Sequence, residues 1–112
     1  MTTLEVITTT VAGGPVVVTP YGDVDLTTSP ALRTLVHQVM DDGATAVVLD
    51  LSDVEFVDST VFGALVSFHR RLGNRLVVAA CPRVRRLLDI TGFTLVLTVT
   101  DSVDTALTVL ES

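Results

Sequence analysis

The sequence alternates short β-branched, apolar runs with amphipathic segments, and this alternation constrains the fold more than any other feature. The apolar runs predict five strands, at residues 4–9, 15–20, 45–51, 75–80 and 95–100. The amphipathic segments predict four helices, which begin at Ser29–Pro30, at Ser59, at Pro82 and at Asp101 or Ser102. Gly43, Gly73 and Gly92 follow the first three of them.

Strands that alternate with helices indicate an α/β domain whose sheet is mostly parallel, with right-handed crossovers. The first two strands are joined by Ala12–Gly14 without a helix, so they predict an antiparallel hairpin. No linker or repeat interrupts the pattern. We therefore expect one domain over residues 1–112, with about five strands and about four helices.

The composition supports a small aliphatic core and excludes several classes of function. Apolar residues make up 48% of the chain but aromatic residues only 4%, so Val and Leu must dominate the core. The formal net charge of −6 disfavours nucleic acid as a partner, because phosphate binding needs a basic surface. All seven basic residues are Arg, and without Lys neither a Schiff-base enzyme nor a P-loop can be built.

The sequence predicts no disulfide and no membrane insertion. Cys81 is the single cysteine, so no internal disulfide can form. The longest purely apolar run, Leu76–Pro82, is far shorter than the ~20 residues that span a bilayer. No signal-peptide pattern opens the chain. We expect a cytoplasmic location.

Several acidic side chains lie in two loops that follow strands. In open α/β sheets, sites cluster beyond the carboxyl ends of the strands, which here means residues 21–29 and 52–59. The acids in these loops are Asp23, Asp25, Asp53 and Asp58. They either bind Mg²⁺ for phosphoryl chemistry, as in a phosphatase, or are ordinary loop residues.

The pair Asp58–Ser59 directly precedes the second helix, and either side chain could cap it. A nucleophilic serine would need a base nearby, but neither a Ser-His-Asp arrangement nor G-x-S-x-G is visible. His37 has no partner at metal-ligand spacing, and His69 lies in an apolar arc. We therefore predict no enzyme, no metal site and no cofactor.

The second helix has an outer face of small residues with one Arg at its end. On a helical wheel this face holds Thr60, Gly63, Ala64, Ser67 and Arg71. An ordinary solvated face would carry Glu, Lys and Gln instead. Small residues allow another surface to approach closely, so the face either packs within the domain or docks a protein partner.

Four segments, in order along nearly the whole chain, resemble the STAS domains of anti-sigma factor antagonists. Gly22–Asp25 resembles the G-x-[LV]-D of that family, and Val48–Thr60 resembles its third strand with the D-S-[ST] signature. Val78–Leu88 resembles the segment from the fourth strand into the third helix, and Ile90–Phe93 resembles the turn that follows.

The resemblance implies a phosphorylation switch and a STAS-type fold. It makes Ser59 the phosphoacceptor, with Asp23, Asp25 and Asp58 around it. It implies that the unphosphorylated form binds an anti-sigma factor, a serine kinase of the GHKL type, and so frees the sigma factor. Phosphorylation would abolish that binding, and a phosphatase would restore it. The outer face of the second helix would then be the docking face.

Two further features of the sequence bear on this hypothesis. The family usually has Gly where this chain has Val61, which motivates the alternative of a STAS subunit that is not phosphorylated, in a lipid ABC transporter or a stress-signalling assembly. Arg83, Arg85 and Arg86 form the one basic cluster, which either contacts carboxylates or phosphates or is a solvated helix face.

Overall fold

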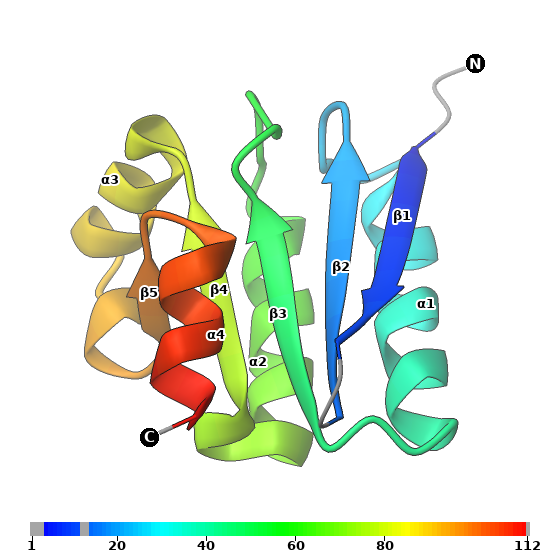
Figure 1. The fold of residues 1–112 in the computed structure, drawn as a ribbon. Coiled ribbons are helices and arrows are strands. Elements are labelled where there is room, and N and C mark those ends of the chain that lie inside the picture. Colours follow the sequence, from blue (N-terminus) through cyan, green and yellow to red (C-terminus); the bar gives the residue numbers. More distant parts are fainter. Residues whose placement is uncertain (1–3, 12–13, 112) are drawn as a thin grey trace.

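The computed structural model describes residues 4–11 and 14–111 and contains one five-stranded sheet in the order β1-β2-β3-β4-β5 (Figure 1). The strands are Glu5–Thr10, Pro15–Tyr21, Ala46–Leu51, Leu76–Ala80 and Thr98–Thr100. β1 and β2 are antiparallel, and every other neighbouring pair is parallel. The predicted mixed sheet is thus confirmed, while the predicted turn at Ala12–Gly14 lies partly outside the described residues.

Four α-helices cover the sheet unequally. They are α1 (Ser29–Asp41), α2 (Thr60–Leu72), α3 (Pro82–Ile90) and α4 (Val103–Glu111). Figure 1 shows α1, α2 and α3 on one face and α4 alone on the other. No helix among the described residues is long and apolar enough to cross a membrane.

β3 lies at the centre of the sheet, and all six of its residues are buried. Its Leu49 and Leu51 join Leu32, Leu65 and other aliphatic side chains in the larger core, beneath α1–α3. Its Val48 instead joins the smaller core, to which α4 contributes Ala106. A strand that is buried on both faces needs the continuous apolar run that predicted it.

Most predicted boundaries agree with the structure to within one or two residues, and the main departures concern the last strand and the cap of α1. The last strand was expected to begin at residue 95, but Phe93–Leu95 is a 3₁₀ turn and β5 begins at Thr98. The turn begins at Gly92, whose φ of 82° is favourable only for glycine, and it leaves Leu95 90% exposed. Ser29 was expected to cap α1, but Thr28 precedes the helix and Ser29 is its first residue.

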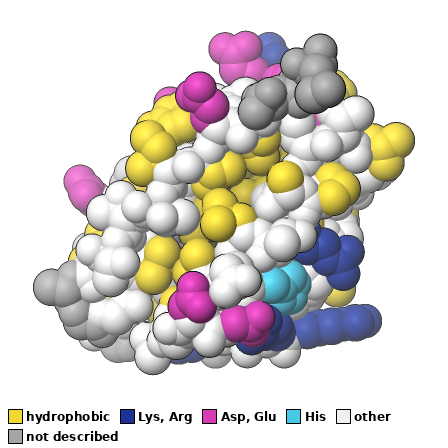
Figure 2. All heavy atoms as spheres, turned by 90° about the vertical axis from the view of Figure 1, so that its right-hand side faces the viewer, with side chains coloured by type: hydrophobic (Ala, Val, Ile, Leu, Met, Phe, Trp, Pro, Cys, Tyr) yellow, Lys and Arg dark blue, Asp and Glu magenta, His cyan; other side chains and the backbone are white. Residues whose placement is uncertain are grey.

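The open edge of the sheet forms a hollow with the first helix. Figure 2 shows hydrophobic side chains gathered in it, with polar side chains around them. A cavity of about 420 Å³ beside this edge is lined by residues that include Thr8, Thr10, Val16, Val39 and Asp42. The hollow lies at the opposite end of the β3 strand from the two loops described next, since Gly43 and Ala44 before β3 also line it.

Candidate functional site

The loops after β2 and β3 are held side by side by backbone hydrogen bonds. The N–H of Val24 donates to the carbonyl of Phe56 at 2.9 Å, and the N–H of Asp58 donates to the carbonyl of Val24 at 3.1 Å. Val24 and Val57 form an isolated parallel bridge, and the Val24 side chain is fully buried. The structure therefore brings the two loops together at the carboxyl end of the sheet, as their positions after parallel strands predicted.

Asp58 connects both loops to the start of α2. Its Oδ1 accepts a hydrogen bond from the N–H of Thr60 at 2.8 Å and another from the Thr60 hydroxyl. Its Oδ2 accepts from the N–H of Leu26, in the other loop, at 2.9 Å. The bonds from Thr60, above all, hold the pKa of the Asp58 carboxyl below its usual value, although desolvation and, less strongly, the nearby Asp25 charge oppose them.

Asp25 organises the entry to α1 in a similar way. Its Oδ1 accepts from the hydroxyl of Thr27 at 2.7 Å, from the N–H of Thr27 at 2.9 Å and from the N–H of Thr28 at 3.2 Å. These bonds, with those from Thr27 the strongest, lower the pKa of the Asp25 carboxyl. The backbone carbonyl of Asp23 accepts a hydrogen bond from the Thr28 hydroxyl, and Asp23 is an exposed residue.

Ser59 differs from its neighbours because its hydroxyl has no hydrogen-bond partner within residues 4–11 and 14–111. The residue is exposed and occupies the N-cap position of α2, where φ is −63° and ψ is −17°. The side chain that accepts the N–H of Thr60 is that of Asp58, so of the two predicted capping residues Asp58 makes the capping bond. Of the adjacent hydroxyls, that of Thr60 is bonded to Asp58, and that of Ser59 has no partner in the described part of the chain.

Val61 fits a regular first helical turn. Its side chain is 2% exposed and packs in the larger core. No non-glycine residue in the described part of the chain has a positive φ, so the position does not require glycine. The departure from the family pattern therefore leaves the backbone around Ser59 undistorted.

The small-residue face of α2 packs partly against α1. Ala64 is 1% exposed. The Ser67 hydroxyl lies 3.0 Å from Nε2 of His37, and Arg71 forms an ion pair with Asp41 at 2.7 Å. Of the predicted docking residues, Ala64 is therefore buried, and Ser67 and Arg71 bind residues of α1. Gly63 and Arg71 are exposed, and Thr60 is half-buried.

The exposed stripe of α2 is rotated about the helix axis by roughly 100°, one residue, from the predicted small-residue face. It contains Ser59, Gly63, Val66 and Arg70. Val66 and Arg70 were not among the residues predicted to dock a partner. The spacing of 4, 3 and 4 residues from Ser59 could have identified them, but only with the position of α1 known. The side of α2 that faces α1 is decided by tertiary packing and cannot be read from a helical-wheel projection of the sequence.

The acids of the two loops do not form a metal site. Within the described ranges, no group of three or more His, Cys, Asp or Glu side chains could hold a metal ion. The carboxylates of Asp25 and Asp58 are occupied by backbone and hydroxyl donors instead. The arrangement positions a loop and a helix start, and it offers one free hydroxyl beside fixed negative charges.

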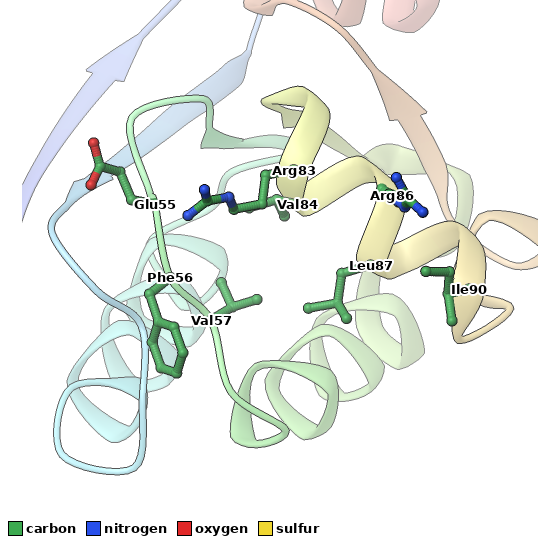
Figure 3. Close-up of a pocket in the computed structure, with 8 residues that line it drawn as sticks. All are labelled: Glu55, Phe56, Val57, Arg83, Val84, Arg86, Leu87 and Ile90. Carbon is green, nitrogen blue, oxygen red and sulfur yellow. The ribbon is translucent and has the colours of Figure 1, made fainter.

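Beside this loop pair, a groove of about 260 Å³ runs between residues 55–57 and α3 (Figure 3). Arg83 and Arg86 line it, while Arg85 is directed to Asp101 and forms an ion pair at 3.0 Å. The three Arg residues of the predicted basic cluster therefore do not share one surface: Arg83 and Arg86 line the groove, and Arg85 does not. The groove itself was not predicted, because it exists only where α3 packs beside the loop.

Comparison with known proteins gives consistent results. Residues 6–106 match the family described as STAS domain. The chain is 35% identical over 97 residues to the anti-sigma-F factor antagonist RsfB of Mycobacterium tuberculosis, covering 82% of this chain and 80% of that protein.

Among solved structures, an anti-sigma factor antagonist from Mycobacterium paratuberculosis superposes with a TM-score of 0.89 at 30% identity, over 98% of this chain and 96% of that one. The Bacillus cell fate determinant SpoIIAA, in its phosphorylated form, has the same fold, with a TM-score of 0.68 at 18% identity over 92% and 96% of the two chains.

Proposed function

The chain belongs to the STAS domain family, among the anti-sigma factor antagonists, and from that premise we propose that it is an antagonist switched by phosphorylation of Ser59. In this proposal the unmodified protein binds an anti-sigma factor and thereby releases a sigma factor. The anti-sigma factor is a serine kinase of the GHKL type, and a phosphatase reverses the modification. The protein is a binding module and not an enzyme.

One observation carries the proposal: Ser59 presents a free, exposed hydroxyl at the N-terminus of α2. The Asp58 side chain next to it fixes the first helical turn through the N–H and hydroxyl of Thr60. A kinase would therefore meet the serine in one backbone conformation. Thr60, the other hydroxyl in the signature, is a poorer acceptor because Asp58 already binds it.

The position of Ser59 allows a phosphate to change binding without unfolding the domain. A phosphate adds about −1.5 to −2 charges at neutral pH. The dipole at the N-terminus of a helix favours an anion there. With Asp23, Asp25 and Asp58 nearby, however, the surface becomes strongly negative, and a partner docked on it meets repulsion and a desolvation cost.

The docking surface in this proposal is the exposed stripe of α2 together with the end of the loop pair. Gly63 and Thr60 keep the role that the sequence suggested, and Val66 and Arg70 extend it along the helix. Ser67 and Arg71 fix α2 against α1 through His37 and Asp41, and Ala64 is buried, while Arg71 itself remains exposed at the end of the helix. The absence of a side chain at Gly63 lets a partner approach the helix backbone.

The test compares Ser59→Ala and Ser59→Asp for binding to the cognate anti-sigma factor by calorimetry, with Thr60→Val as the matched variant at the neighbouring hydroxyl. We expect Ser59→Ala to bind like wild type and Ser59→Asp to bind at least about tenfold more weakly, a loss of ~1.4 kcal/mol. Intact-mass analysis with ATP and the anti-sigma factor should show one phosphate on wild type and none on Ser59→Ala. Equal affinity of the two Ser59 variants would refute the switch.

The alternative of a STAS subunit without phosphorylation rested on Val61. Because Val61 is buried in an undistorted helical turn, that residue no longer favours the alternative. Co-purification with an ABC transporter, without phosphate on Ser59, would restore it.

A further inference from the structure

The groove between residues 55–57 and α3 is apolar at its base and basic at its rim. Figure 3 shows the side chains of Val57 and Leu87 pointing toward each other across it, and that of Arg83 reaching from α3 toward the loop. Glu55 also lines the groove, with its carboxylate directed away from α3 in this view. The two walls thus come from segments about 30 residues apart in the chain, which only the packing of α3 brings together.

Large apolar side chains are exposed around this groove. Phe56 is 53% exposed and Ile90 is 72% exposed, and both line it. Exposed apolar side chains of this size, with polar residues around them, are typical of an interaction site. The volume of about 260 Å³ is below the range of about 300–1,000 Å³ of most small-molecule pockets, so it suits a few side chains of a protein rather than a whole cofactor.

The charges of the groove specify the chemistry of its partner. Neither Arg83 nor Arg86 forms an ion pair in the part of the chain that the structure describes, whereas Arg85, between them, is paired with Asp101. A guanidinium presents a planar fork that matches a carboxylate. The guanidinium groups of Arg83 and Arg86, beside the apolar base of the groove, complement a protein segment that is apolar on one side and carries carboxylates at its edges.

We propose that this groove binds an acidic amphipathic helix of a protein partner. Its apolar residues, spaced three and four apart, enter between Val57 and Leu87, and its carboxylates pair with Arg83 and Arg86. The net charge of −6 does not prevent this, because charges beyond a Debye length of about 8 Å are largely screened. An anionic membrane, an extended charged surface, would instead be repelled by the acidic remainder of the molecule.

The experiment uses the isotope-labelled full chain and a synthetic peptide of about 15 residues, with Leu on one helical face and Glu on the other. We expect amide shifts at residues 55–57 and along α3. Two control peptides of the same length, one with Lys for Glu and one with Ser for Leu, should bind at least about tenfold more weakly.

Matched variants of the chain separate this groove from general charge effects. Arg83→Glu with Arg86→Glu should weaken binding of the acidic peptide at least about tenfold, whereas Arg33→Glu with Arg75→Glu, the same change in net charge elsewhere, should leave it nearly unchanged. Ile90→Asp should also weaken it, whereas Leu95→Asp, at a residue 90% exposed outside the groove, should not. Circular dichroism checks that each variant folds.

Three outcomes would overturn the proposal: equal binding of the Lys peptide, shifts confined to other surfaces, or binding of phosphatidylglycerol vesicles through Arg83 and Arg86 in place of the peptide. The proposal does not depend on phosphorylation. Ser59→Ala should bind the peptide like wild type, so a failure of the switch at Ser59 and a failure of this groove give different results.

Discussion

At the scale of single residues, the Asp58 carboxylate has the most consequences. It accepts hydrogen bonds from the N–H of Leu26, in the loop after β2, and from both the N–H and the hydroxyl of Thr60, the first residue of α2. An asparagine would keep one acceptor oxygen and replace the other by an NH₂ group. Either Leu26 or Thr60 would then face a donor instead of an acceptor.

Asp58→Asn should therefore lower the midpoint of urea unfolding at pH 7. The sign of its pH dependence follows from the lowered pKa: the stabilising effect of the carboxylate is complete above the usual Asp pKa of about 3.9 and is lost as the pH falls through the folded value. Urea unfolding between pH 7 and pH 2 should show wild type and variant converging below about pH 4.

Asp53→Asn is the control, because Asp53 is exposed and its carboxylate has no hydrogen-bond partner in the described part of the loop. It should unfold at nearly the wild-type midpoint throughout. A constant difference between Asp58→Asn and wild type down to pH 2 would contradict the assigned role.

The sequence predicted that Asp58 or Ser59 caps α2, but not which of the two side chains makes the capping bond. Both residue types cap helices, and the pattern alone cannot say which oxygen reaches the N–H groups. The answer depends on the loop after β2, because Leu26 fixes the second oxygen of Asp58. It therefore required the tertiary structure.

At the scale of elements, α1 and α2 meet through a chain of hydrogen bonds at His37. Nδ1 of His37 lies 3.0 Å from Nη1 of Arg71 and accepts a hydrogen bond from its N–H, because a guanidinium can only donate. Nε2 therefore carries the imidazole hydrogen and donates to Ser67 at 3.0 Å. The Ser67 hydroxyl donates in turn to the carbonyl of Ala64 at 2.8 Å. A protonated imidazole would lose the bond from Arg71 and face its positive charge.

Burial, together with the charges of Arg71 and Arg33, lowers the pKa of His37, and Asp41 only partly opposes them. The folded state therefore binds a proton less readily than the unfolded state, whose His titrates near 6.5. The stability that this histidine supplies is complete above pH 6.5 and is lost as the pH falls below it. Urea unfolding from pH 8 to pH 5 should show this loss in wild type and a smaller loss in His37→Gln, and identical slopes would contradict it.

The number, type and order of the regular elements could be predicted from the sequence, because each strand and helix has its own periodicity. What could not be predicted was how they face each other. Ala64 lies on the small side of the α2 wheel yet is buried by α1, and Val66 lies on the apolar side yet is 40% exposed. The groove beside α3 was missed for the same reason, since it depends on a contact between residues distant in the chain.

At the scale of the whole molecule, a charged group at Ser59 should alter binding without altering the fold. The net charge of −6 becomes about −8 when a phosphate is added, but the new charge lies at the N-terminus of α2, where the helix dipole favours it. We expect phosphorylated protein and Ser59→Asp to keep the circular dichroism spectrum of wild type.

The thermal midpoints of both forms should equal or exceed that of Ser59→Ala, measured by scanning calorimetry at low ionic strength. Raising the salt concentration should reduce any gain, because the helix dipole is screened. A large drop in the midpoint on phosphorylation would instead mean that the modification acts by local unfolding.

The bridge between Val24 and Val57 has a consequence for the order in which the molecule forms. It joins residues more than 30 positions apart, and it lies beyond the parallel pair β2–β3, whose own contacts require a long crossover through α1. Such non-local pairings form late, since the entropy of closing the chain must be offset first. A nascent or unfolded chain therefore carries Ser59 without the folded loop pair around it. Under the proposed switch, a kinase that requires this loop pair would modify completed molecules and leave incomplete ones unmodified.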